Sequence, residues 1–376
     1  MENNYFFIPN LDSMENDIKY LGRVSIKELM KQCESNENCV AFNTIGYIKT
    51  LVNDTLVYSN CFYKDSDGIY IHKERYEKMG KNLIDLLDNN NLSYKNIKKL
   101  NPVNSYDLFF KKLYKIKQTI NYEADDLIPN FIHFIYIHGG HPFVLSHYLA
   151  IKTAFVIQKP SKIFLYNDIE PLNNVWWDRA KQIATIINIT IPKMLNDHEI
   201  IYKQHQADIM RINILNMIGG IYLDIDILSL KNLRNLRKHN IVMGREDGKG
   251  LCNCVIMTKP NTNFFKKWIK AYETSYGQVE DYWVGLSVRK PAELAKKYEN
   301  EIHIEPQDSF TPFLYLDDTI YFSFDCQELY EDSYTIHLWD TEAFKRNVIP
   351  KDIDYFKNND NTFTKLFINY IKEYIK

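Results

Sequence analysis

The segment from His205 to Asp226 carries acidic and basic side chains at regular spacing. Asp208 and Arg211 are three residues apart, so on a helix they share one face. Asp224 and Asp226 are two apart, and on a strand such residues point to the same side. Two carboxylates this close repel each other unless a cation lies between them. Mg²⁺ and Mn²⁺ are hard cations that prefer such oxygen ligands. The segment therefore predicts a divalent-cation site with open positions for phosphate oxygens.

The pattern around these residues predicts a helix, a turn and a strand. Apolar residues recur with helical periodicity through residues 203–217, and Gly219-Gly220 suits a helix end with left-handed backbone. Residues 221–223 are apolar and fit a short strand, so both aspartates follow its carboxyl end. Open α/β sheets bind ligands outside these strand ends. The predicted cation site would lie there.

Short apolar runs alternate with helical periodicity over a much longer part of the chain. We expect strands at 131–137, 163–166, 221–223, 241–243 and 255–257, and helices at 147–157, 178–185 and 203–217. Strands that alternate with helices predict an α/β fold whose sheet is covered on both faces.

The first third of the chain has a different character. A helix is expected at 24–32 and strands at 40–43 and 68–71, followed by an Asn-rich stretch and a Lys-rich helix at 106–120. We expect two domains: a small N-terminal mixed α+β module with its linker at 1–120, and the α/β domain at 121–376. Their boundary falls between residues 88 and 125.

Composition and charge exclude several classes of protein. Hydrophobic residues make up 45% of the chain, which is enough for a sizeable core. The net charge of −2 argues against a general nucleic-acid binder, which would be basic. We find neither a signal peptide nor a long apolar stretch, so the expectation is a soluble cytoplasmic protein without a transmembrane helix.

Six cysteines are scattered through the sequence. Their spacing is typical of neither a disulfide framework nor a zinc site. We expect Cys252 and Cys254 to be small buried apolar residues, and a reducing compartment fits the whole set.

The central segment also resembles a known motif. Its matching positions are Ala207, Asp208, Arg211, Gly219, Gly220, Tyr222, Asp224 and Asp226. They are similar to the donor site of the sugar-binding DXD glycosyltransferases, a group that includes capsular-polysaccharide transferases and mannosyltransferases. The glucosyltransferase domain of the large clostridial toxins is a relative. The resemblance implies a GT-A-type, Rossmann-like domain that binds a nucleotide-sugar.

More distant segments extend the resemblance over roughly residues 128–345. Residues 128–136 are similar to the family's first strand, where an aromatic stacks on the nucleotide base. This implies base binding by Ile135 and Tyr136, although Tyr136 replaces the usual Trp and an aromatic filling the sheet edge is the alternative. Asn253 falls in a segment that faces the reaction centre in this family.

A late His-x-Trp segment matches at His337 and Trp339. The resemblance implies that His337 completes the metal shell and that Trp339 borders the donor phosphates. A structural histidine on an apolar strand and a packed tryptophan are the alternatives.

The family implies a retaining transfer of a hexose from a nucleotide-sugar, a UDP-sugar first, to an unidentified glycan or protein acceptor. Mn²⁺ or Mg²⁺ would be bound directly by Asp226, with Asp224 supporting it or holding the ribose and sugar hydroxyls. Asp208 and Arg211 would grip the sugar, one by accepting and the other by donating hydrogen bonds. Tyr222 would belong to the donor site.

Two other classes remain as alternatives. Asp224-Ile-Asp226 also resembles the strand end of haloacid-dehalogenase-type phosphohydrolases, but their later motifs are not evident here. A transferase fold with lapsed catalysis, used as a carbohydrate-binding scaffold, is the other. The N-terminal module is similar to PAN/apple-like modules, which suggests acceptor recognition or a structural cap.

Overall fold

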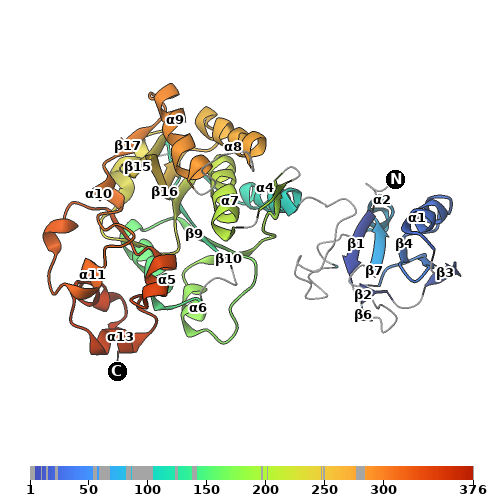
Figure 1. Cartoon of the computed structure of the whole chain (residues 1–376), viewed down its shortest axis with the longest axis horizontal. Coiled ribbons are helices and arrows are strands. Elements are labelled where there is room, and N and C mark those ends of the chain that lie inside the picture. Colours follow the sequence, from blue (N-terminus) through green and yellow to red (C-terminus); the bar gives the residue numbers. More distant parts are fainter. Residues whose placement is uncertain are drawn as a thin grey trace. The chain divides into compact units, whose positions relative to one another are not determined.

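The computed structural model divides the chain into two compact units, Met1–Leu108 and Phe109–Lys376 (Figure 1). The structure describes residues 5–9, 11–13, 16–21, 24–53, 57–58, 68–81, 86, 105–122, 126–137, 142–195, 198–200, 202–246, 248, 250–276 and 284–375.

The first unit is built on a five-stranded antiparallel sheet. Its strand order is β1 (Tyr5–Pro9), β7 (Gly68–His72), β4 (Ala41–Asn43), β5 (Tyr47–Lys49) and β3 (Asp17–Tyr20). Strands β2 (Leu11–Asp12) and β6 (Val57–Tyr58) form a separate pair. Helix α1 (Ile26–Glu34) begins at Ser25, whose hydroxyl accepts a hydrogen bond from the Glu28 amide. Helix α2 (Lys73–Lys78) follows β7 directly.

A disulfide joins Cys33 and Cys39 in this unit, contrary to the expectation that the cysteines stay unpaired. It closes the loop that follows α1. The guanidinium of Arg75 donates hydrogen bonds to the carbonyls of Cys33, Asn36 and Cys39, and so also holds this loop. Disulfides are rare in reducing compartments, so this pair does not favour the compartment expected from the sequence.

The second unit contains a seven-stranded mixed sheet. The order is β10 (Thr185–Asn188), β9 (Lys162–Asn167), β8 (Phe131–Tyr136), β13 (Gly220–Leu223), β16 (Gly250–Thr258), β15 (Ile241–Glu246) and β17 (His303–Glu305). The four strands from β10 to β13 run parallel. Strand β16 is antiparallel to both of its neighbours, and β17 is parallel to β15.

Helices from several parts of the chain pack around this sheet. Helix α5 (Leu145–Thr153) packs on α6 (Val175–Ala180), and both contribute to one core cluster with alternate residues of β8. Helix α7 (Lys203–Ile218) packs on α8 (Asn263–Ser275), which packs on α9 (Lys290–Lys297) (Figure 1). The predicted α/β class is therefore confirmed. Helix α4 (Ser105–Gln118) precedes β8 in sequence, the π-helical turn η3 (Ala154–Gln158) follows α5 directly, and the π-helical turn η5 (Gly285–Arg289) directly precedes α9.

One predicted helix is misplaced. The sequence predicts a helix at 178–185, whereas α6 ends at Ala180 and Thr185 begins strand β10. The side chain of Asn174 accepts hydrogen bonds from the amides of Trp176 and Trp177, which fixes the start of the helix several residues earlier.

The last part of the chain pairs with the segment after β13 in a separate two-stranded ladder. Strand β14 (Ile227–Ser229) pairs with β18 (Thr335–His337) in antiparallel register. Helix α10 (Gln307–Phe310) packs against β18. The other short helices of this part of the chain are η4 (Leu233–Lys238), α11 (Thr319–Phe322), η6 (Gln327–Leu329), α12 (Asp340–Arg346), α13 (Ile353–Asn358), α14 (Thr362–Phe367), η7 (Ile368–Tyr370) and η8 (Lys372–Tyr374). Strands β11 (Met194–Leu195) and β12 (His198–Glu199) form one more pair. Among the described helices, none has both the length and the hydropathy to cross a bilayer.

Candidate active site

Two glycines connect helix α7 to strand β13. Gly219 and Gly220 have φ angles of +73° and +111°, a region that other residues rarely adopt. A Cβ atom on Gly219 would lie 2.6 Å from Cδ of Pro260, and one on Gly220 would lie 2.7 Å from the carbonyl oxygen of Phe131. Only glycine fits this close turn without a shift in the backbone, so the turn fixes where α7 ends and β13 begins.

The two aspartates of the motif lie in a tight turn directly after β13. The strand ends at Leu223, and the amide of Ile227 donates to the carbonyl of Asp224 at 2.9 Å, which closes the turn. The Asp224 amide donates to the carbonyl of Cys254 on β16, also at 2.9 Å. The turn, rather than the period-two alternation of a strand, brings the carboxylates together. The predicted proximity is correct, but the predicted cause is wrong.

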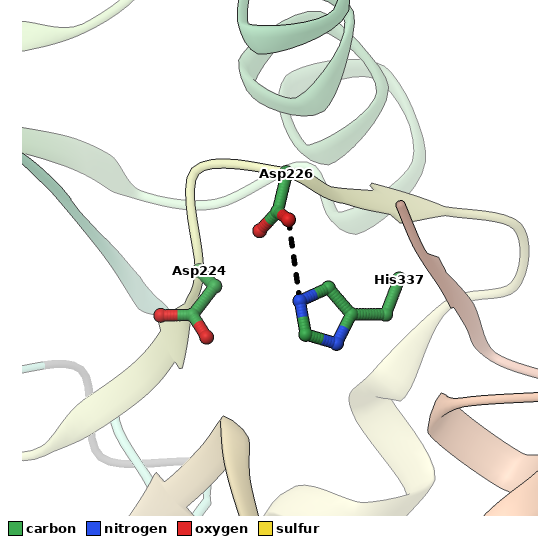
Figure 2. A group of neighbouring side chains, drawn as sticks. All are labelled: Asp224, Asp226 and His337. Carbon is green, nitrogen blue, oxygen red and sulfur yellow. Dashed lines mark ion pairs between the residues drawn. The ribbon is translucent and has the colours of Figure 1, made fainter. Parts of the chain in front are cut away.

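His337 reaches the same turn through the β14–β18 ladder. Ile227 is the register partner of His337, and the amide of Leu338 donates to the carbonyl of Asp226 at 3.1 Å. Nε2 of His337 lies 3.2 Å from Oδ2 of Asp226. Asp224, Asp226 and His337 each offer one atom that could bind a metal, and these three atoms lie within 4.8 Å of one another (Figure 2). We call these three residues the turn corner.

The turn corner is an electrostatically strained group of buried side chains. Burial raises the pKa of Asp226, but His337 and the amide of Asp340 lower it more, to about 2. Burial lowers the pKa of His337, but the charge of Asp226 raises it to about 9. Burial also raises the pKa of Asp224, and the neighbouring Asp226 adds to that rise. Two carboxylates thus share one imidazole as their source of positive charge here, apart from the arginine that contacts Asp224.

A second group of charged residues lies where α7 meets β16. Asp208 and Arg211 are on one face of the helix, as predicted, with Nη2 of Arg211 3.3 Å from Oδ1 of Asp208. Asn253 donates from Nδ2 to the same oxygen at 2.8 Å, and its carbonyl accepts from Nη1 of Arg211 at 2.7 Å. The three side chains, which we call the α7 corner, therefore hold one another in place.

The strand that carries Asn253 is irregular at this point. Met243 of β15 is paired with Ile256, but the next residue, Gly244, is paired with Cys252. The extra residues on β16 form a bulge that includes Asn253, which leaves the regular ladder and turns towards α7. The bulge explains why both the side chain and the carbonyl of Asn253 contact α7 residues.

Asp224 links the two corners. Its Oδ1 lies 3.1 Å from Nη2 of Arg211 and accepts a hydrogen bond from the hydroxyl of Tyr222 at 2.6 Å. The guanidinium of Arg211 lies over the ring of Tyr222, 4.5 Å from its centroid. Burial raises the pKa of Asp208 to about 6, and Arg211 opposes this rise. Asp208 therefore titrates closer to neutral pH than an ordinary aspartate, and the charge of Arg211 is shared between two carboxylates.

The aromatic residues predicted for donor binding lie beside the turn corner. The ring of Tyr136 packs against Phe143 and Trp177, with centroids 5.2 and 5.7 Å away. The indole of Trp339 stacks on His337 at 4.1 Å and donates to the carbonyl of Phe313 at 2.7 Å. Trp339 has a φ of +52°, a strained backbone of the kind found at functional sites.

A single cavity of about 560 Å³ joins these groups. This volume lies within the roughly 300–1,000 Å³ that small-molecule sites occupy. All sequence-predicted site residues line it: Ile135, Tyr136, Asp208, Arg211, Tyr222, Asp224, Asp226, Asn253, His337 and Trp339. Residues separated by two hundred positions in the sequence thus meet in one place.

Three further residues of this site were not predicted from the sequence. The backbone amide of Asp340 donates to Oδ2 of Asp226 at 2.7 Å, and its carboxylate accepts from Nε2 of His147 at 2.8 Å. His147 lies on α5, and its Nδ1 accepts from the amide of Val144, which assigns the proton to Nε2. Tyr272 of α8 donates to Oδ2 of Asp208 at 3.4 Å. The position of Asp340 directly after the His-x-Trp segment was the one available signal.

Comparison with known proteins agrees with this geometry. The sequence model of the family described as "Glycosyltransferase sugar-binding region containing DXD motif" matches residues 25–243. This range covers more than half of the chain and includes Asp208, Arg211, Asp224 and Asp226. The chain belongs to this family and is a glycosyltransferase.

Individual relatives are more distant. Glucan organizing enzyme 1 of Cryptococcus neoformans var. grubii is 27% identical over 267 residues, which span 65% of this chain and 71% of that protein. The solved structure of PaToxG glycosyltransferase is 18% identical, with a TM-score of 0.33 over 52% of this chain and 80% of its own. The glycosyltransferase GlyE of Streptococcus pneumoniae TIGR4 is 14% identical, with a TM-score of 0.36 over 65% of this chain and 60% of its own.

Proposed function

We propose that this glycosyltransferase moves a hexose from a nucleotide-sugar, most readily a UDP-sugar, to a hydroxyl of a glycan or protein acceptor with retention of anomeric configuration. The observation that carries the proposal is the meeting of the turn corner and the α7 corner in one cavity. The first offers two carboxylates and an imidazole to a divalent cation. The second offers charged groups of both signs to sugar hydroxyls.

The turn corner fits a resident divalent cation. Nδ1 of His337 and Oδ1 of Asp340 are buried and have no hydrogen-bond partner among the described residues, so the corner is not a closed network. Asp226, Asp224 and His337 would hold the ion, Asp226 most directly. Carboxylates suit Mg²⁺ and Mn²⁺. The additional imidazole favours Mn²⁺, which accepts nitrogen ligands more readily than Mg²⁺. Such an ion, when bound, offsets the negative charge of a departing diphosphate.

The α7 corner supplies a grip on the sugar. Arg211 is held by Asp208, Asp224 and the carbonyl of Asn253, so its guanidinium is fixed before a ligand arrives. Asp208 keeps its second oxygen, Oδ2, in a long hydrogen bond from Tyr272 that a sugar hydroxyl can replace or share. Pre-organised groups of this kind lower the reorganisation needed at the transition state.

The remaining roles follow from position in the cavity. Ile135 and Tyr136, at the carboxyl end of β8, would contact the nucleotide base, and Trp339 would border the phosphates. Tyr222 holds Asp224 through its hydroxyl. In the transfer, the bond from the anomeric carbon to the diphosphate oxygen breaks and a bond to the acceptor oxygen forms on the same face. The acceptor proton passes to the departing phosphate oxygen.

The phosphohydrolase alternative has less support. It would make Asp224 a nucleophile, and with Oδ1 engaged by Tyr222 and Arg211 only Oδ2 could attack. The family match points to sugar transfer instead. A phosphatase assay without nucleotide-sugar tests this alternative directly.

A screen of nucleotide-sugars tests the proposal. We expect Mn²⁺-dependent release of nucleoside diphosphate from one of them in the absence of acceptor, together with a rise in the thermal midpoint. Both should disappear with a chelator. The matched control for Asp226→Asn is Asp332→Asn, because Asp332 is fully exposed and has one long ion pair, to Lys231. Metal-independent release, or none from any UDP- or GDP-sugar, would overturn the proposal.

A further inference from the structure

Two thiols lie side by side in the wall of the same cavity. Cys252 and Cys254 are separated by one residue on β16, and their sulfur atoms are 3.2 Å apart. They are not joined by a disulfide, and both are buried, with 5% and 1% of their surface exposed. Both line the cavity together with Asp224 and Asp226. Buried apolar packing, as the sequence suggested, does not by itself bring two sulfurs this close.

The bulge in β16 accounts for the short distance. In a regular strand, alternate residues share a face but their side chains stand well apart. Between Met243 and Gly244 the pairing on β16 jumps from Ile256 to Cys252, so the strand bends where the two cysteines lie. The hydrogen bond from the Asp224 amide to the Cys254 carbonyl anchors this bend to the turn corner.

The 3.2 Å separation of the two sulfur atoms fits a ligand that bonds both at a narrow angle. Zinc, with bonds to sulfur of about 2.3 Å at tetrahedral angles, holds two sulfurs roughly 3.8 Å apart. With bonds of the same length, an angle near a right angle reduces this span to roughly 3.3 Å. Trivalent arsenic has a lone pair that narrows its bond angles in this way. Among the described residues, the cysteines also belong to no group with the further ligands that zinc requires.

We propose that Cys252 and Cys254 form a dithiol site for trivalent, three-coordinate thiophilic ligands, of which organic arsenicals are the test case, and that occupying it blocks the donor cavity. The reaction is balanced without an oxidant. A dihydroxyarsine loses its two hydroxyl groups as water, each taking the proton of one thiol. Two As–S bonds replace two As–O bonds, and arsenic stays trivalent.

The consequence for the active site follows from the residue between the two cysteines. Asn253 donates to Asp208 and accepts from Arg211, so its position depends on the bend that the thiols share. A bridging arsenic atom with its organic substituent would occupy cavity space beside Asp224 and Asp226 and constrain Asn253. We therefore expect loss of nucleotide-sugar hydrolysis when the site is filled.

The experiment treats the full chain with phenylarsine oxide without prior reduction, because a reductant would open the Cys33–Cys39 disulfide into a second dithiol. Intact mass should show one phenylarsenic group per chain, bound with loss of water. Alkylation mapping of this unsubstituted protein should show Cys252 and Cys254 protected together. A dithiol should reverse the adduct and a monothiol should not, because a two-point attachment resists single-thiol exchange. Mn²⁺ with nucleoside diphosphate should slow the reaction.

Single substitutions test which cysteines bind the arsenical, and each variant is compared with its own uninhibited rate so that differences in folding do not matter. Cys252→Ser and Cys254→Ser should each raise the half-inhibitory concentration by about 100-fold, measured against the variant's own uninhibited rate, because a two-point attachment becomes a single one. The matched control is Cys326→Ser, since Cys326 is also buried and unpaired but contacts Thr362 instead. Cys61, outside the described residues, is replaced in a second control.

Three results would overturn the inference: no adduct on the protein with its disulfide intact, an adduct mapped to other cysteines, or a dithiol-specific adduct that survives either single substitution. Because the adduct is read by mass and alkylation, the outcome does not depend on whether the proposed sugar transfer is correct. An adduct without inhibition would refute the blocking part alone.

Discussion

The two corners of the cavity solve the problem of buried charge in opposite ways. In the α7 corner, Asp208 is paired with Arg211, which it shares with Asp224, and Asn253 contacts both Asp208 and Arg211. In the turn corner, Asp224 and Asp226 outnumber the single imidazole of His337. A buried group whose charges are paired is a fixed surface, whereas one with excess negative charge favours an added cation. The difference indicates that the α7 corner is ready for its ligand and that the turn corner is completed by one.

The largest effect is expected at the turn corner. Replacing Asp226 by Asn or Ala removes the most buried carboxylate of the proposed cation site, and we expect kcat for nucleotide-sugar hydrolysis to fall by about 10²- to 10³-fold. Mn²⁺-dependent stabilisation should fall with it. Asp332→Asn, at an exposed carboxylate, should leave both unchanged. Near-normal activity of the Asp226 variants would contradict the proposed difference between the two corners, since the turn corner would then need no cation.

The next effect distinguishes the corners from each other. Arg211→Lys keeps the charge but loses the fork that contacts Asp208, Asp224 and the Asn253 carbonyl together. We expect kcat/KM to fall by about 10- to 100-fold while Mn²⁺ affinity changes much less. The exposed Arg234 provides the control substitution, Arg234→Lys. An equal loss of metal affinity would mean that the two corners act as one unit.

The pH dependence of metal binding tests the charge balance of the turn corner. A cation that binds His337 must displace its proton, and the pKa of His337 is raised to about 9. Mn²⁺ affinity should therefore rise with pH by up to about tenfold per unit between pH 6.5 and 9. Titration calorimetry in buffers of different ionisation enthalpy measures the released proton. His337→Gln should remove most of this slope, and a flat profile for the unsubstituted protein would show that His337 is no ligand.

The stability of the metal-free protein should also depend on pH, because Asp226 and His337 form an ion pair. The pKa of His337 is higher in the folded chain than its ordinary value, so its stabilising contribution is present below about pH 6.5 and is lost as the pH rises through 9. The pKa of Asp226 is depressed to about 2, so that contribution is lost as the pH falls from about 4 through 2. Both contributions come from the same ion pair, between Asp226 and His337. We expect the metal-free thermal midpoint to fall in both directions, less so in His337→Gln.

The sequence predicts much of the turn corner because its parts are local. Helix α7, the glycine pair, strand β13 and the two aspartates follow one another, and each has a periodicity or a backbone requirement that the residue types reveal. His337 required the family resemblance, because its meeting with Asp226 depends on pairing between strands far apart in the chain. Asp340 acts through its backbone amide, which carries no signature in the sequence.

The α7 corner was less predictable for a related reason. The spacing of Asp208 and Arg211 places them on one helix face, but Asn253 reaches them through a bulge. Whether a strand bulges depends on what packs against it, which no local pattern records. The Cys33–Cys39 disulfide was missed because two cysteines in a short loop do not form a recognisable framework. In each case a tertiary contact decided what local periodicity left open.

The smallest effect concerns the hydroxyl of Tyr272, which donates to Oδ2 of Asp208 over a long 3.4 Å. Tyr272→Phe removes that bond without creating a cavity, and we expect KM for the nucleotide-sugar to rise by about two- to fivefold, with kcat nearly constant. Burial raises the pKa of Asp208 to about 6, and the Tyr272 hydrogen bond opposes this rise. The acid limb of the kcat/KM profile should therefore move to higher pH in the variant. Tyr114→Phe, at an exposed tyrosine, is the control. If Tyr272→Phe raises KM but leaves the acid limb in place, its hydroxyl positions the sugar directly. The α7 corner would then be less complete without its ligand than its ion pairs suggest.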